Sequence, residues 1–348
     1  MKVLVIESGG LGDFVSTMPA IKLIGEKFSD AKIIVKLPKW YASFARNIPY
    51  IHEVLEMNPN YSIIKTVHEI RKDKYDLVIN FHPARKNTIF TLLARGRRKV
   101  GYFVAMSSEH YSYRANHFAE IRGLRFKSGK IDPGISLYER ALIIARLVTK
   151  DNLLFITDPY IKNDLSKKST LLLERLSLSS KKFVTLHPFS SKSTKNWPSE
   201  RIKSFIDLLA LEFNVPVLIL GSEKDLIIIS EVIQEKPGKC ILLTPPMEGL
   251  AEILSKSLFF VGVDSGPLHI AVSSGLPAIG LFGRTAPTLA FPKSFQNKKS
   301  FFIYKNYQCK CSYNACIEMG MCMSMITAEE VIEAAKTFQL ELPNENLL

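Results

Sequence analysis

The chain has 348 residues, 47% of them hydrophobic, a size that suits two α/β domains better than a single core. No tract is rich in glycine, proline or serine, so the composition excludes a fibrous or disordered protein. The first ten residues lack the apolar core of a signal peptide, and no apolar run approaches the roughly 18 residues of a membrane span. These features predict a cytoplasmic protein.

The net charge of +13 is concentrated in the first half of the chain. Residues 1–165 hold 26 Lys and Arg against 16 Asp and Glu, a net +10, whereas the remainder holds 20 against 17, a net +3. A basic half predicts an anionic partner, which is a nucleic acid, an acidic membrane surface or a phosphorylated acceptor. An ordinary lysine-rich surface is the alternative interpretation.

A glycine-rich turn follows the first predicted strand, Lys2–Glu7. The turn ends in Gly10-Leu11-Gly12-Asp13 and leads into a helix whose first turn is expected to contain Pro19. The G-x-G-x-x-G of a dinucleotide site is absent, and no clear acidic residue ends the second predicted strand, which disfavours a dehydrogenase. Asp13, at the helix entrance, is either a helix cap or a functional carboxylate.

A second polar segment follows a buried strand predicted at Leu77–Asn80. Because open α/β sheets bind ligands at the carboxyl ends of their strands, His82, Arg85 and Lys86 are candidate contacts for an acceptor. A solvated loop is equally consistent with the two basic side chains. Residues 103–131, which include Arg114, mix aromatic and basic side chains without clean periodicity. That mixture suits single-stranded nucleic acid or a phosphorylated sugar-lipid.

The alternation of strands and helices resumes after an amphipathic helix at 136–147 and a linker predicted at 150–166. The loop after the strand Phe183–His187 carries hydroxyls and lysines that suit a diphosphate, although a polar loop anchored by Trp197 is the alternative. Glu223, after the next strand, is a candidate for holding a ribose or for capping a helix. Met247 either lines a base pocket or belongs to the core.

The most informative stretch is 259–292. A buried strand is predicted at Phe259–Val263, then a short polar turn, a helix from Leu268 and a second strand at Ala278–Phe282. Backbone N–H groups at such a helix start suit a phosphate, although Pro267 lacks one and a simple capping turn is the alternative. The candidate residues at this turn are Asp264, Ser265, Gly266 and His269.

These segments, in this order, resemble the ADP-heptose:lipopolysaccharide heptosyltransferases, glycosyltransferase family 9. The resemblance rests on Gly10–Asp13 with the following Thr17–Ile21, on Lys195–Pro198, on Asp264–His269 and on Gly283–Pro287. It implies the GT-B fold, an α/β architecture of two Rossmann-like domains whose parallel sheets face each other across a central cleft. The domains expected are an acceptor-binding domain at 1–160, a nucleotide-sugar-binding domain at 161–326 and a C-terminal helix at 327–348 that packs back on the first domain.

The resemblance also implies an activity, which is inverting transfer of a heptose from ADP-heptose to the lipopolysaccharide inner core, on the cytoplasmic face of the inner membrane. Asp13 would be the catalytic base, and Lys195 would contact the departing diphosphate. The residues implied to bind the donor are Ser193, Thr194, Glu223, Met247, Asp264, Ser265, Gly266 and His269. Those implied to bind an anionic, lipid-linked acceptor are Gly10, Gly12, His82, Arg85, Lys86 and Arg114.

No cofactor is expected, and no catalytic metal, because no Asp-x-Asp pair stands at a strand end. Four cysteines lie close together near the C-terminus, and we expect reduced thiols because their spacing is not that of a zinc knuckle. These are Cys309, Cys311, Cys316 and Cys322. Two other functions stay open, a GT-B transferase for another nucleotide-sugar and a binding protein without turnover. Peripheral membrane contact is expected, and nucleic-acid binding is not.

Overall fold

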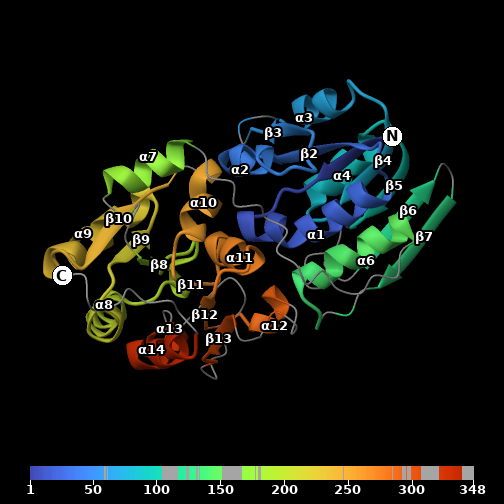
Figure 1. The fold of residues 1–348 in the computed structure, drawn as a ribbon. Helices are drawn as coiled ribbons and strands as arrows, with labels where there is room; N and C mark the ends of the chain where they lie inside the picture. Colours follow the sequence, from blue (N-terminus) through green and yellow to red (C-terminus); the bar gives the residue numbers. More distant parts are fainter. Residues whose placement is uncertain are drawn as a thin grey trace. The chain divides into compact units, whose positions relative to one another are not determined.

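The structure is a computed structural model, and its described residues form two compact units, Met1–Tyr160 and Ile161–Leu348 (Figure 1). None of the described helices has the length and apolar composition that crossing a bilayer requires. The described residues are 1–58, 60, 62–103, 117–122, 125–130, 132, 134–150, 167–176, 178, 182–245, 247–283, 285–291, 295, 299–306 and 321–338.

The first unit is built on a seven-stranded sheet with the order β3-β2-β1-β4-β5-β6-β7. The first five strands are parallel, and Ile6 at the end of β1 pairs with Asn80 at the end of β4, so the loops after these strands meet at one edge. The strands are β1 (Lys2–Ile6), β2 (Lys32–Pro38), β3 (Glu53–Met57), β4 (Tyr75–Asn80), β5 (Gly96–Gly101), β6 (His117–Arg122) and β7 (Arg125–Lys130).

Helices pack on this sheet through apolar side chains. Leu4 and Ile6 of β1 form a buried cluster with Ile70 and Phe90, which belong to α3 and α4, while α1 packs against α6. The helices of the unit are α1 (Leu11–Lys27), α2 (Ala42–Arg46), α3 (Ile63–Ile70), α4 (Arg85–Leu93) and α6 (Leu137–Thr149), with a 3₁₀ turn, η1 (Lys39–Tyr41).

Two features of the first unit differ from the expectations. Helix α1 begins at Leu11, so Pro19 lies inside it rather than in its first turn. The helix continues past Pro19 to Lys27, although a proline cannot donate the usual hydrogen bond to the preceding turn. Part of the stretch without clean periodicity forms β6 and β7, an antiparallel pair attached to β5. The sequence pattern did not predict these strands, because charged residues occupy much of both and obscure the alternation of apolar and polar side chains.

The second unit contains a six-stranded parallel sheet with the order β10-β9-β8-β11-β12-β13. Gly262 of β11 pairs with His187 at the end of β8, which brings the loops that follow these two strands to one edge. The strands are β8 (Val184–His187), β9 (Val217–Leu220), β10 (Cys240–Leu243), β11 (Phe260–Val263), β12 (Ala278–Phe282) and β13 (Ser300–Tyr304).

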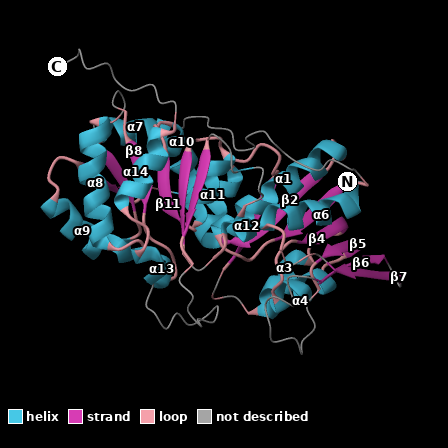
Figure 2. Cartoon of the chain, turned by 90° about the horizontal axis from the view of Figure 1, so that it is seen from below, coloured by secondary structure: helices cyan, strands magenta, loops and turns pink. Residues whose placement is uncertain are grey.

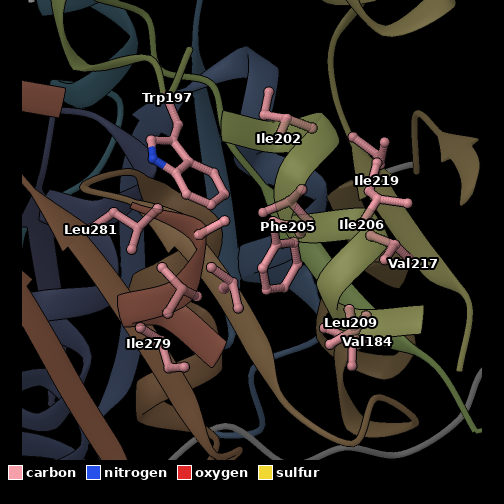
Figure 3. Packing of buried hydrophobic residues seen from close by; sticks show 14 of the residues in the cluster. Val184, Trp197, Ile202, Phe205, Ile206, Leu209, Val217, Ile219, Ile279 and Leu281 are labelled. Carbon is pink, nitrogen blue, oxygen red and sulfur yellow. The ribbon is translucent and has the colours of Figure 1, made fainter. Parts of the chain in front are cut away.

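Alternate residues of these strands serve two helix layers. Ile279 and Leu281 face a cluster built with α8 and α14, while Gly280 between them lies against Leu268 of α11. Figure 3 shows part of the first cluster, with Trp197 and Phe205 among strand residues. The helices are α7 (Lys167–Arg175), α8 (Ser199–Phe213), α9 (Leu226–Glu235), α10 (Leu250–Ser255), α11 (Gly266–Ser273), α12 (Pro287–Ala290), α13 (Met321–Ser324) and α14 (Ala328–Lys336).

The last described helix, α14, has the capping box that its sequence predicts. Thr327 accepts a hydrogen bond from the Glu330 backbone, and the Glu330 side chain accepts one from the Thr327 backbone. Its apolar side chains Val331 and Ile332 are buried in the cluster that α8 lines, so this face of the helix packs within the second unit.

Candidate functional site

Asp13 is held at the carboxyl end of β1 by the glycine-rich turn. Gly10 is the N-cap residue of α1, and its N–H donates to Asp13 Oδ2 at 2.7 Å. Asp13 therefore does cap the helix, as one interpretation of the sequence held, but the bond uses only one carboxylate oxygen. No hydrogen bond to Oδ1 is seen among the described residues. Gly12, in the first helical turn beside Asp13, is half-buried.

Gly9 allows a close approach that the sequence interpretation did not single out. A Cβ atom at Gly9 would lie 2.6 Å from Asp13 Oδ2 and 2.8 Å from Nδ1 of His82. Any larger side chain would therefore displace both groups. His82 follows β4, where its backbone N–H donates to Asn80 Oδ1 at 3.1 Å. The structure thus brings Asp13 and His82 together at one point of the sheet edge.

Glu7 is the third ionisable group of this cluster, and the sequence analysis missed it. Its side chain is 1% exposed, Oε1 accepts from the Gly9 N–H at 2.6 Å, and His82 Nδ1 lies 3.5 Å from the same oxygen. Oε2 is buried without a hydrogen-bond partner among the described residues. Burial, and secondarily the charge of Asp13, raises the pKa of Glu7 well above its usual value. An acidic residue closing an apolar strand was the available signal.

The basic candidates of the first unit lie on the same edge. Arg85 and Lys86 form the exposed first turn of α4, three and four residues after His82. The charge of Lys86 acts on Glu7, whose pKa it lowers to a smaller extent than burial raises it. Arg114, the remaining acceptor candidate, lies outside the described residues.

In the second unit a lysine and an aspartate far apart in sequence form an ion pair. Lys195 Nζ donates to Asp264 Oδ2 at 2.5 Å, across 69 positions of sequence. Lys195 ends the 3₁₀ turn η2 (Ser193–Lys195) after β8, and Asp264 follows β11 directly. Trp197 anchors the lysine loop, because its indole N–H donates to the Ile326 carbonyl at 3.0 Å and its ring packs on Phe205.

A buried histidine approaches the other oxygen of Asp264. His269 Nε2 lies 3.8 Å from Asp264 Oδ1, and the imidazole, 3% exposed, stacks on Phe291 with ring centroids 4.4 Å apart. Burial opposes ionisation of Asp264, but hydrogen bonding to His269 and the charge of Lys195 outweigh it and hold its pKa well below the usual range. Asp264 is therefore an anion with two donor groups beside it.

Ser265 begins helix α11, and His187 fixes its hydroxyl. Ser265 is the N-cap residue but makes no side-chain cap bond, and its Oγ lies 3.0 Å from Nδ1 of His187. Burial lowers the pKa of His187 to about 4, so the imidazole is neutral at pH 7. Gly266 and Pro267 form the start of the helix. His187 ended the expected strand, yet nothing in the local pattern predicted its link to Ser265.

The other donor candidates lie around the same sheet edge with fewer contacts. Ser193 is exposed and Thr194 half-buried in η2, and Met247 is half-buried in the 3₁₀ turn η4 (Met247–Gly249). Glu223 is exposed in η3 (Glu223–Asp225). The capping role considered for Glu223 belongs to Asp225, whose Oδ2 accepts from the Ser222 N–H at 2.8 Å and from its hydroxyl at 2.6 Å.

The described residues at the two sheet edges do not form a cluster of metal ligands. Within the described part of the chain, no three His, Cys, Asp or Glu side chains are arranged to hold a metal ion. Of the clustered cysteines, Cys322 is buried in α13, and Cys309, Cys311 and Cys316 lie outside the described residues.

Comparison with known proteins identifies relatives over nearly the whole chain. Lipopolysaccharide heptosyltransferase 3 of Escherichia coli K12 is 25% identical over 345 residues, which is 93% of this chain and 94% of that protein. Lipooligosaccharide heptosyltransferase 2 of Campylobacter jejuni is 23% identical over 347 residues, 97% of this chain and 98% of that protein.

Solved structures confirm the expected α/β fold with two parallel-rich sheets. The structure of E. coli ADP-heptose lps heptosyltransferase II matches with a TM-score of 0.73 at 19% identity, over 97% of this chain and 98% of that one. E. coli heptosyltransferase WaaC with ADP matches with a TM-score of 0.71 at 18% identity, over 97% and 99%. The model of glycosyltransferase family 9 (heptosyltransferase) matches residues 63–321. The chain belongs to glycosyltransferase family 9, the family of the heptosyltransferases.

Proposed function

We propose that this protein is an inverting, metal-independent transferase that moves a heptose from ADP-heptose to the inner core of lipopolysaccharide. Family membership supports the reaction class. The relatives named for lipopolysaccharide support the acceptor, and solved neighbours that bind ADP and ADP-2-deoxy-2-fluoro heptose support the donor. The acceptor is anionic and lipid-linked, so the protein works in the cytoplasm in peripheral contact with the inner membrane.

The observation that carries the proposal is the Lys195–Asp264 pair at the start of α11. It fixes an ammonium group beside a helix N-terminus, and both favour an anion. In glycosyl transfer, negative charge grows on the departing diphosphate, and fixed donors lower the barrier because they need no reorganisation. Ser193, Thr194, Ser265 and Gly266 supply further donors, while His269 positions Asp264.

Asp13 acts as the base in this scheme. The acceptor oxygen attacks the anomeric carbon, the bond from that carbon to the diphosphate breaks, and the acceptor proton passes to Asp13. A single displacement inverts the anomeric configuration. Gly10 and Gly12 shape the turn around Asp13, and His82, Arg85, Lys86 and Arg114 contact the anionic acceptor. Glu223 and Met247 contact the nucleoside.

The test is transfer from a panel of nucleotide-sugars to a Kdo-bearing lipid A acceptor in the presence of EDTA. We expect nucleotide release and a heptosylated product with ADP-heptose only, and NMR of the new linkage should show the inverted anomer. Activity with only another nucleotide-sugar would show that ADP-heptose is not the donor. A product with retained anomeric configuration would contradict the single displacement. Nucleotide binding without product would leave a binding protein.

A further inference from the structure

Helices α3 and α4 of the first unit lie side by side (Figure 2). Their exposed side chains are both aliphatic and basic. The two helices run the same way, since each follows a strand of the parallel part of the sheet. Arg71, just after α3, donates to the carbonyl of Leu93 at the end of α4 at 2.8 Å, which ties their ends together. We call the exposed side chains of these two helices, with Arg71 and Lys72, the α3–α4 face.

Large aliphatic side chains are exposed at both ends of this face. Ile63 and Ile64 open α3 with exposed fractions of 47% and 81%, and Leu92 and Leu93 close α4 with 46% and 44%. The helices themselves are about 12 Å long, so both pairs lie within one small surface. Ile70 and Phe90 already fill the inner side against the sheet. The exposed four are not part of that buried cluster.

Charge on the same segment is strongly positive. Residues 62–101 contain ten Lys and Arg against three Asp and Glu, a net +7 of the +13 of the chain. The acidic side chains all bind inward or at the sheet edge, because Glu69 pairs with the buried Lys36 at 2.8 Å, and Asp73 and Asp76 bind Lys2. The outer surface carries exposed basic groups instead, namely Lys65, Arg71, Lys72, Arg85 and Lys86.

We infer that the α3–α4 face is a docking surface for a bilayer containing anionic lipids. Lysine and arginine are attracted to anionic headgroups, while Leu and Ile side chains insert at the level of the acyl boundary. A nucleic acid would match the charge of this face but not its apolar side chains. Single strands are held by stacking on aromatic residues, and the exposed apolar residues here are aliphatic. The inference deepens the membrane contact of the proposed function by naming the surface.

The second unit contains a matched contrast. Ile227 is also the second residue of a helix, α9, and is 76% exposed, between exposed Leu226 and Ile228. Around it, however, residues 222–235 contain four acidic residues and one lysine, a net −3. An anionic bilayer repels that surface, so apolar exposure alone does not predict binding there.

The experiment is co-sedimentation of the full chain with vesicles of phosphatidylcholine alone and of phosphatidylcholine mixed with phosphatidylglycerol. We expect binding to the anionic vesicles only, weakened by salt. Ile64→Ser should lower the partition coefficient about tenfold, and Lys65→Gln with Lys72→Gln also about tenfold or more. Ile227→Ser is the control and should bind as the wild type does. All replaced side chains are exposed, and thermal melting checks that each variant folds.

Three results would overturn the inference. The first is that the protein does not bind anionic vesicles, and the second is that Ile227→Ser weakens binding as much as Ile64→Ser does. The third is that duplex DNA releases the vesicle-bound protein while Ile64→Ser binds the vesicles as the wild type does. Because the assay contains neither donor nor acceptor, it is independent of the heptosyl-transfer reaction. Heptosyl transfer to a detergent-solubilised acceptor can therefore succeed when vesicle binding fails, and vesicle binding can succeed when transfer fails.

Discussion

The two clusters at the strand ends differ in whether their carboxyl groups have oppositely charged partners. In the second unit Asp264 is an anion with Lys195 at one oxygen and His269 beside the other. In the first unit Glu7 keeps a buried oxygen without a partner among the described residues, and the charge of Asp13 adds to the cost of ionising it. A paired cluster keeps its charges when pH or ligands change, whereas neighbouring carboxyl groups respond to both. We infer that Asp264 stays ionised, whereas the surroundings of Glu7 favour its protonated form.

The largest effect that would test this contrast is expected at Asp13. Asp13→Asn keeps an oxygen that can accept the Gly10 N–H but cannot take the acceptor proton, so kcat should fall roughly a thousandfold. Affinity for ADP-heptose, measured by calorimetry, should be unchanged. Asp30→Asn, at an exposed position of the same unit, is the control. A fully active Asp13→Asn would leave Asp13 only its capping role.

A somewhat smaller loss is expected at Lys195. Lys195→Met removes the cation beside the leaving group, and kcat should fall about a hundredfold, with weaker ADP binding by calorimetry. The same substitution at Lys192, exposed in the same loop, should change kcat little. If Lys195→Met weakens ADP binding but leaves kcat intact, the lysine binds the ground state and does not assist departure of the diphosphate.

Beside the Lys195–Asp264 pair, His187 should make the stability of the protein depend on pH. Its pKa is about 4 in the folded protein and about 6.5 in an unfolded chain, so only the unfolded state gains a proton between these values. The contribution of His187 to stability is therefore complete above pH 6.5 and is lost towards pH 4, by up to about 3 kcal/mol.

Urea unfolding across this range measures the effect. His187→Asn should flatten the dependence of the unfolding free energy on pH, and His68→Asn, at an exposed site of the first unit, is the control. Equal slopes in the wild type and His187→Asn would mean that the imidazole is not held neutral by burial.

The smallest effect is expected at Glu7, with the opposite sign. Because its pKa is raised on folding, the folded protein holds a proton that the unfolded chain releases, and stability falls as pH rises above about 4.5. Glu7→Gln cannot ionise, so it should be more stable than the wild type by about 1 kcal/mol at pH 8 and equal to it near pH 4. Urea unfolding measures this difference. A destabilised Glu7→Gln at pH 8 would contradict a neutral Glu7, and Glu26→Gln on the exposed side of α1 is the control.

Local patterns in the sequence were sufficient for the strands and helices around both clusters. Short apolar runs bounded by polar turns predicted β1, β4, β8 and β11 within a residue or two, because a strand buried on both faces needs such a run. The capping box at Thr327 and the polar turn at Asp264 could also be predicted, because the start of a helix depends on a few adjacent residues. The positions of Asp13 and Lys195 at strand ends followed directly.

Only the tertiary structure decided which of these loops meet. Lys195 reaches Asp264, and His187 reaches Ser265, because β8 and β11 are neighbours in the sheet, and no local pattern specifies that order. The unpartnered oxygen of Glu7 depends in the same way on what β4 and α1 place around it. The sequence by itself therefore determined the elements and the kinds of chemical group at their ends, whereas strand order, a non-local property of packing, decided which groups became partners.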